Sequence, residues 1–170
     1  NIRAYQLNWN GEYIWYRPDL MREKVGCVPH TKEYFEVPEK LITQRISRQL
    51  LVAYDNQQNY FLDTTNVSNY HTWDKKTPIK YLCGLLNSKL INYWYCKKYL
   101  LPTIGGYELH SIPVKTMDSY IAFITLVDEA ILASEKRDYT TLSLKMKKID
   151  RIVYDIYGLT EDEIKIIEES

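Results

Sequence analysis

The chain has 170 residues and no net charge, with 22 Lys+Arg against 22 Asp+Glu. This length fits one domain, or one domain with an appendage. The charge balance lacks the basic excess that is typical of proteins binding nucleic acid or membranes. The three cysteines show no CxxC spacing, and the longest apolar run is far too short to span a bilayer. Asn1 is not followed by a signal-peptide pattern, so we expect a fragment of a longer cytoplasmic protein with reduced thiols.

The first half of the chain has the pattern of short strands separated by polar segments. Asn10-Gly11 lies between aromatic-rich runs within residues 4–16, which predicts a β-hairpin turning at that dipeptide. A polar stretch containing three prolines then runs to about residue 39. Beyond it, the sequence predicts strands at residues 40–46, 49–54 and 59–64, and a polar loop at residues 66–76.

Helical spacing begins at Pro78, a residue well suited to a first helical turn. Apolar residues at positions 79, 82, 85 and 86 predict one helix, and Ser88 can cap a second. Gly105-Gly106 follows; it permits close approach of the backbone to a ligand, although an ordinary loop is the simpler interpretation. Residues 107–113 are predicted to form a last strand.

From residue 118 onward the pattern is wholly helical. Helices are predicted at residues 118–136 and 141–157, and Thr160 with Glu163 predicts a capping box for a short final helix. Gly158 stands where a left-handed C-terminal residue belongs. We therefore expect an α+β fold: a mixed β-sheet with a central helix pair over residues 1–117, then a helical hairpin and an acidic C-terminal helix over residues 118–170.

The zero net charge is an average over two unlike parts. Residues 1–117 hold 15 Lys+Arg and 10 Asp+Glu, whereas residues 118–170 hold 7 and 12. The excess is concentrated in residues 40–98, which carry nine cations against three carboxylates, with Tyr, His, Trp, Asn, Ser and Thr interleaved. Such a pattern suits phosphate contact and base reading. A solvated surface with a few structural aromatic residues explains the composition equally well.

Motifs that carry catalysis are absent from the sequence. It has no Gly-rich phosphate loop, GxSxG, HExxH or Cys/His cluster with zinc spacing, and its only ExK is Glu163-Ile164-Lys165 in the acidic last helix. Cys96 and His110 would supply too few ligands for a zinc site. There is also no Asn/Asp-Pro-Pro-aromatic motif of adenine methyltransferases. We expect this fragment to be non-catalytic and to need no cofactor or metal of its own.

Several stretches resemble one known family. Pro38–Ile42, Arg45, Ala53–Asp55 and Tyr60-Phe61 look like the opening of the TaqI-like C-terminal specificity domain. Residues 81–93, which contain LLNSKL, resemble the most recognisable helix pair of that family, and residues 109–114 resemble its closing strand. Residues 149–164, which contain YDIYGLTEDE, are similar to the C-terminal end of many combined restriction–modification enzymes.

The resemblance implies a DNA target-recognition domain of a type IIG restriction enzyme or adenine-N6 DNA methyltransferase, in the cytoplasm of a bacterium or archaeon. Its partners would be double-stranded DNA and the N-terminal catalytic domains of the parent chain. S-adenosylmethionine and magnesium would be cofactors of that parent, not of this fragment. The acidic tail would point away from the duplex.

Within this hypothesis, two groups of residues are candidates for contact with DNA. Lysines and arginines suit phosphates, and the polar residues suit bases or sugars. Arg45 could instead hold a strand in place, and Asn66 could be a turn residue. The phosphate candidates are Arg45, Arg48, Lys75, Lys76 and Lys80, and the base or sugar candidates are Asn66, Asn69, His71 and Tyr107.

A different function class remains open at this point. Leu142, Met146, Ile149, Val153 and Ile156 are spaced four and three residues apart in turn, as in a heptad seam. The C-terminal helices could thus form a protein-interaction module or a homodimer. The simpler alternative is that they pack on each other and on the preceding domain.

Overall fold

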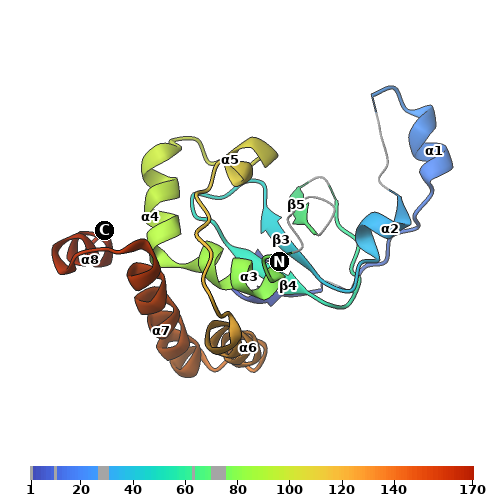
Figure 1. The fold of residues 1–170 in the computed structure, drawn as a ribbon. Coiled ribbons are helices and arrows are strands. Elements are labelled where there is room, and N and C mark those ends of the chain that lie inside the picture. The colour runs from blue at the N-terminus through green and yellow to red at the C-terminus, as the bar shows by residue number, and fades with distance from the viewer. Residues whose placement is uncertain (1, 10, 27–30, 63, 70–75) are drawn as a thin grey trace.

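The computed structural model describes residues 2–9, 11–26, 31–62, 64–69 and 76–170, and it confirms the α+β fold (Figure 1). Two small antiparallel sheets are accompanied by helices that predominate toward the C-terminus. The strands are β1 Ile2–Arg3, β2 Gln6–Leu7, β3 Lys40–Gln44, β4 Val52–Asp55 and β5 Thr65–Ser68. The helices are α1 Pro18–Glu23, α2 Lys32–Phe35, α3 Ile79–Asn87, α4 Lys89–Lys98, α5 Gly106–His110, α6 Ile121–Glu135, α7 Tyr139–Tyr157 and α8 Glu161–Glu168.

The larger sheet has the order β4-β3-β5, with β3 antiparallel to both neighbours. Residues 40–43 of this central strand are all buried, as a strand covered on both faces requires. β1 and β2 form a separate hairpin that docks on β4, where Tyr5 N donates to Val52 O at 2.9 Å. The chain turns at Ala4-Tyr5, with Tyr5 at φ 62.

One predicted hairpin and two predicted strands differ from the structure. The hairpin turn expected at Asn10-Gly11 lies instead at residues 4–5; Asn10 is outside the described residues, and residues 11–17 form no strand. The described part of residues 59–64 is not a strand either. β5 forms instead at Thr65–Ser68, where a polar loop was expected over residues 66–76, because it pairs with β3. Residues 106–110 are helical rather than extended, since Glu108 Oε2 accepts from Gly105 N at 2.9 Å and caps the turn.

The helix pair α3–α4 forms where its sequence signals predict it. Pro78 immediately precedes α3, and Ser88 caps α4 by accepting a hydrogen bond from Ile91 N. Two asparagines of this pair then bind the backbone before and at the start of β4. Asn87 accepts from Val52 N at 3.0 Å and donates to Val52 O at 2.8 Å; Asn92 does the same with Leu50, at 2.8 and 3.2 Å.

The larger of two hydrophobic clusters connects the sheet to the C-terminal helices, and a smaller one contains Ile2, Ile42 and Ala53. The larger cluster, which we call the core, runs from Val52 of β4 through Leu85 of α3 to Phe123 of α6 and Val153 of α7. The predicted boundary between two domains at residue 117 remains a prediction. The core includes residues on both sides of it. The heptad-like positions of α7 are in or against the core, so the seam packs within the chain. A homodimer through that seam would first have to separate it from the core.

Figure 1 also shows how the ends of the molecule are arranged. The acidic helix α8 and the C-terminus lie at one end, and α1 lies at the opposite end beyond α2. α7 is on the same side as α8, while β5 and α5 lie between the two ends. The acidic part of the chain is therefore distant from the face that α1, α2 and β5 form.

Candidate nucleic-acid interface

The loop after β3 carries two of the predicted phosphate-binding residues. Arg45 and Arg48 are both exposed. Their backbone is held from two sides: Ile104 N donates to Arg45 O at 2.7 Å, and Ser47 N donates to Pro102 O at 2.8 Å. Cys96 Sγ of α4 lies 3.2 Å from Arg48 O. The loop thus presents both arginines from fixed backbone.

The last turn of α4 adds further cations to this region. Lys97 and Lys98 are exposed and lie over the rings of Tyr93 and Trp94, at 5.4 and 4.6 Å from the ring centroids. Cations at a helix C-terminus are stabilised by the helix dipole. Because Arg48 lies against Cys96, we define the basic edge as Arg45, Arg48 and Lys97. Lys97 belongs to the basic stretch but is not among the predicted phosphate contacts.

A cleft of about 920 Å³ opens between the N-terminal arm, which contains α1, and the pair β5 and α5. Aromatic and aliphatic side chains make up much of its lining, and hydroxyl, amide and imidazole groups occupy the β5 and α5 side. No Asp or Glu is among the described residues that line it. Its residues are Ile14, Trp15, Tyr16, Arg17, Leu20, Met21, Lys24, Tyr34, Phe35, Tyr60, Phe61, Leu62, Thr65, Asn66, Val67, Ser68, Gly106, Leu109 and His110.

The arm supplies the cations of this cleft. Arg17 Nε donates to Asp19 Oδ1 at 2.8 Å, and its guanidinium lies 4.9 Å from the ring centroid of Trp15. The hydrogen bond from Arg17 lowers the pKa of Asp19 to about 2, so this carboxyl is ionised at neutral pH. Lys24 is exposed at the end of α1. The described lining residues thus carry a net positive charge, which the adjacent Asp19 partly offsets.

The structure brings some of the predicted base-contacting residues to the cleft. Asn66 of β5 lines it and donates from Nδ2 to Ile104 O at 2.7 Å, which also fixes the amide. Tyr107 is 79% exposed on α5, whose neighbours Gly106 and His110 line the cleft. Lys76 is exposed just before α3. Lys75 and His71 lie outside the described residues.

Two other predicted residues have structural partners. Lys80 Nζ pairs with Asp128 of α6 at 2.6 Å and lies over the ring of Tyr54, which connects α3 to α6. Asn69 is 0% exposed and donates from Nδ2 to Tyr34 O at 3.0 Å, joining the end of β5 to α2. DNA contact by either residue stays a prediction, and these contacts indicate a packing role.

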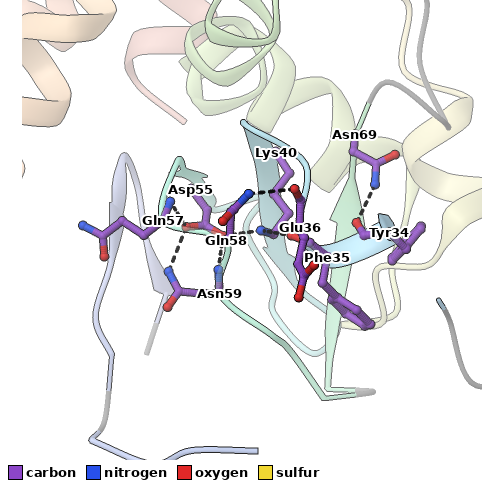
Figure 2. A network of polar contacts seen from close by, with 9 residues as sticks. All are labelled: Tyr34, Phe35, Glu36, Lys40, Asp55, Gln57, Gln58, Asn59 and Asn69. Carbon is purple, nitrogen blue, oxygen red and sulfur yellow. Dashed lines mark hydrogen bonds and ion pairs between the residues drawn. The ribbon is translucent and has the colours of Figure 1, made fainter. Parts of the chain in front are cut away.

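The basic stretch also contains a cation that sequence reasoning misplaced. The pattern of residues 40–98 predicts Lys40 as one of the cations available to DNA, yet its side chain is 0% exposed and pairs with Asp55 at 2.6 Å. Figure 2 shows this pair at the centre of a polar network that reaches Phe35, Gln57 and Asn59. The correction follows from tertiary burial: residue 40 begins a central strand, and its periodicity alone does not reveal a buried lysine.

The described residues give no indication of a metal site or a membrane segment. No three or more His, Cys, Asp and Glu side chains among them gather as a metal ion would require. In the same part of the chain, no helix combines the length and the apolar character needed to cross a bilayer.

Comparison with known protein families gives a match. The family model of the TaqI-like C-terminal specificity domain matches residues 1–114, which includes the cleft, the basic edge and the helix pair. A search of curated proteins finds no match.

Proposed function

Because the chain belongs to the family of TaqI-like C-terminal specificity domains, we propose that it recognises a specific sequence of double-stranded DNA on behalf of a restriction–modification enzyme. The family supports a DNA-recognition role in such enzymes. The observation that carries the proposal for this chain is the cleft: polar groups of β5 and α5 line an open hollow, and no Asp or Glu is among the described residues that line it. The exposed Arg45 follows β3, the strand that pairs with β5.

The candidate side chains fall into two chemical groups, cations and neutral hydrogen-bonding groups. Arg45, Arg48 and Lys76 are exposed cations that suit phosphate oxygens, contacts that position a protein on a duplex without reading its sequence. Asn66 and Tyr107 offer hydrogen-bonding groups for bases or sugars, and the cleft adds Ser68 and His110 to them. An amide or imidazole can distinguish base pairs by their donor and acceptor pattern in the major groove.

In this proposal, the domain fixes the register of the parent enzyme so that one adenine can be extruded into an adenine-N6 methyltransferase pocket. The parent is a type IIG restriction enzyme or a methyltransferase of bacterial or archaeal cytoplasm. S-adenosylmethionine and magnesium belong to its catalytic domains, and no step on this chain passes through them. The alternative, a dimerisation module on the C-terminal helices, has less support because the α7 seam packs within the core.

The test is selection from duplexes with a randomised central segment. The wild-type chain should enrich one sequence. His110→Ala should relax the preference at one or two positions, whereas Arg48→Ala should weaken binding to all duplexes about equally and lower the salt slope by about one. Lys147→Ala, on the exposed part of α7, is the matched control. Absence of any enriched sequence would overturn the proposal.

A further inference from the structure

The pair Lys40–Asp55 is the most deeply buried ion pair among the described residues, with side chains 0% and 1% exposed. The two residues face each other across β3 and β4. Asp55 also accepts from Gln57 N at 2.9 Å, Asn59 N at 3.1 Å and Asn59 Nδ2 at 2.8 Å. Burial of two charges is costly unless such partners satisfy them, and hydrophobic replacements often stabilise a fold equally well. Stability is thus a weak explanation for this pair.

The pair holds two segments that are distant in sequence. Lys40 Nζ donates to the carbonyl of Phe35, the last residue of α2, at 2.7 Å. The same Nζ lies 5.8 Å from the ring centroid of Phe61. Asp55 binds the turn at residues 57–59 through the three contacts above. Figure 2 shows α2 and this turn converging on the pair.

Both segments form one side of the cleft, which we call the aromatic wall: Tyr34, Phe35, Tyr60 and Phe61. Phe35 stacks on Tyr60, with ring centroids 4.8 Å apart and planes 23° apart. Glu36 joins the segments again, since its carbonyl accepts from Gln58 Nε2 at 2.8 Å and its carboxylate accepts from Tyr60 Oη at 2.5 Å. Tyr34 continues the wall to the sheet by donating to Val67 O at 3.0 Å.

We infer that Lys40 and Asp55 are positioning residues for DNA recognition: their buried ion pair sets the aromatic wall against β5, and thereby the shape of the cleft that reads the duplex. This inference rests on the proposed function. Hydrogen bonds from charged groups are directional and short. A hydrophobic pair of similar volume would fill the same space, but it would not hold the Phe35 carbonyl or the amides of residues 57 and 59.

The double variant Lys40→Met/Asp55→Leu tests whether the pair positions the aromatic wall or only stabilises the fold. We expect it to remain folded, with a denaturation midpoint close to that of the wild-type chain, because residues 57 and 59 are exposed or half-buried and their amides can bond to water instead. Hydrogen exchange is then followed at two amides that do not bond to the pair. Glu36 N donates to Lys32 O and Thr65 N donates to Leu62 O, so faster exchange there reports movement of the wall rather than loss of an acceptor.

We expect exchange at Glu36 and Thr65 to accelerate at least about tenfold, while amides of α3 and α7 keep their protection. The affinity ratio between the duplex that the wild-type chain selects and a scrambled duplex should fall about tenfold. Lys145→Met/Glu129→Leu is the matched control, because it removes an ion pair of similar length between α6 and α7. It should change neither measurement.

Unchanged exchange at both amides, or an unchanged affinity ratio despite faster exchange, would overturn the inference. If the wild-type chain selects no duplex, the proposed function fails and the inference about recognition fails with it, while the exchange data still decide whether the pair holds the wall. If the double variant does not fold, Asn59→Ala replaces it, because this change removes one tether of Asp55 and leaves the pair intact. It should then produce the same effects, smaller in size.

Discussion

At the scale of single residues, the amides of Asn87 and Asn92 act as a neighbouring strand would act on the chain entering β4. Each binds both the N–H and the carbonyl of one residue, Val52 or Leu50. A buried backbone group without a partner destabilises a fold by about 1–3 kcal/mol. Asn87, the asparagine of the LLNSKL stretch, thus has a physical role in docking the helix pair on the sheet.

Asn87→Ala should therefore lower the free energy of unfolding by about 2–4 kcal/mol, since it removes the partner of Val52 N and leaves a cavity. Urea denaturation followed by tryptophan fluorescence measures the change. Asn56→Ala, at an exposed position, is the control and should change the free energy by less than about 0.5 kcal/mol. An equal effect of the two variants would disprove the docking role.

The buried carboxyl of Asp150 in α7 should make the free energy of unfolding depend on pH in an unusual direction. Its carboxyl accepts from Lys89 N at 2.8 Å, and burial raises its pKa to about 6. The folded state therefore binds the proton more tightly than the unfolded chain, whose aspartates titrate near 4. The contribution of Asp150 to stability is present below pH 4 and is lost as the pH rises to about 6.

Asp150→Asn keeps an acceptor for Lys89 N and removes this titration. The free energy of unfolding of the variant, relative to the wild-type chain, should increase by about 2 kcal/mol between pH 4 and pH 7. Urea denaturation at several pH values measures the difference. A difference that is constant with pH would show that Asp150 titrates normally in the folded chain.

At the scale of elements, α3 packs closely on α6 at Gly84. A Cβ atom at Gly84 would lie 2.5 Å from Phe123 Cε1 and 2.6 Å from Val127 Cγ2. Both side chains are fully buried, so neither can move away without disturbing the core. Glycine at this position lets α3 approach α6 closely, which aligns the helix pair with the C-terminal hairpin.

Gly84→Ala should lower the free energy of unfolding by about 1–3 kcal/mol, because overpacking outweighs the better helix propensity of alanine. The matched control is Gly106→Ala in α5, where a Cβ would meet nothing within 4 Å. Thermal denaturation of both variants tests whether α3 and α6 pack this closely. A stabilising effect of Gly84→Ala would mean that α3 and α6 do not pack this closely.

The elements that could be predicted from sequence are those with local signals. The caps and apolar spacing placed α3, α4, α7 and α8 close to their observed bounds, because helices form from contacts within a few residues. The short strands are harder to predict from the sequence. β5 depends on pairing with β3, and the hairpin β1–β2 depends on docking of Tyr5 on Val52, neither of which is a local property.

The candidate site likewise contains residues that local sequence patterns reveal and residues whose placement depends on tertiary contacts. The basic stretch pointed to Arg45, Arg48 and Lys76, which are exposed as surface cations should be. It also included Lys40, whose burial depends on its strand, on α2 and on Asp55 together. The cleft itself combines residues from 14 to 110, and no local pattern could have joined the arm to β5 and α5.

At the scale of the whole molecule, the zero net charge conceals a separation in space. The basic part of the chain carries the cleft, and α8 lies at the end opposite α1 (Figure 1). The basic edge is nearer to α8, since Lys97 lines a hollow together with Glu163. With a Debye length of about 8 Å at physiological salt, acidic groups at that distance hardly affect a duplex in the cleft. Neutrality of the total is thus compatible with DNA binding.

Charge reversal in the tail should therefore matter less than loss of a cation on the basic edge. Glu135→Lys/Glu169→Lys, at exposed C-terminal ends of α6 and α8, should change duplex affinity by less than about twofold at 150 mM salt. Arg48→Ala should weaken it by about three- to tenfold. Fluorescence anisotropy measures both, and a larger effect of the tail variant would place the duplex near the C-terminal helices.

The central claim, that this chain binds duplex DNA through exposed cations and reads it in the cleft, is tested most directly by one salt titration. Affinity of the wild-type chain for its selected duplex and for a scrambled duplex is measured by anisotropy from 50 to 200 mM salt. With about four phosphate contacts, both affinities should fall by about a hundredfold over this range. The selected duplex should stay the tighter ligand throughout. Affinities that do not change with salt, or that are equal for the two duplexes at every salt concentration, would contradict the account.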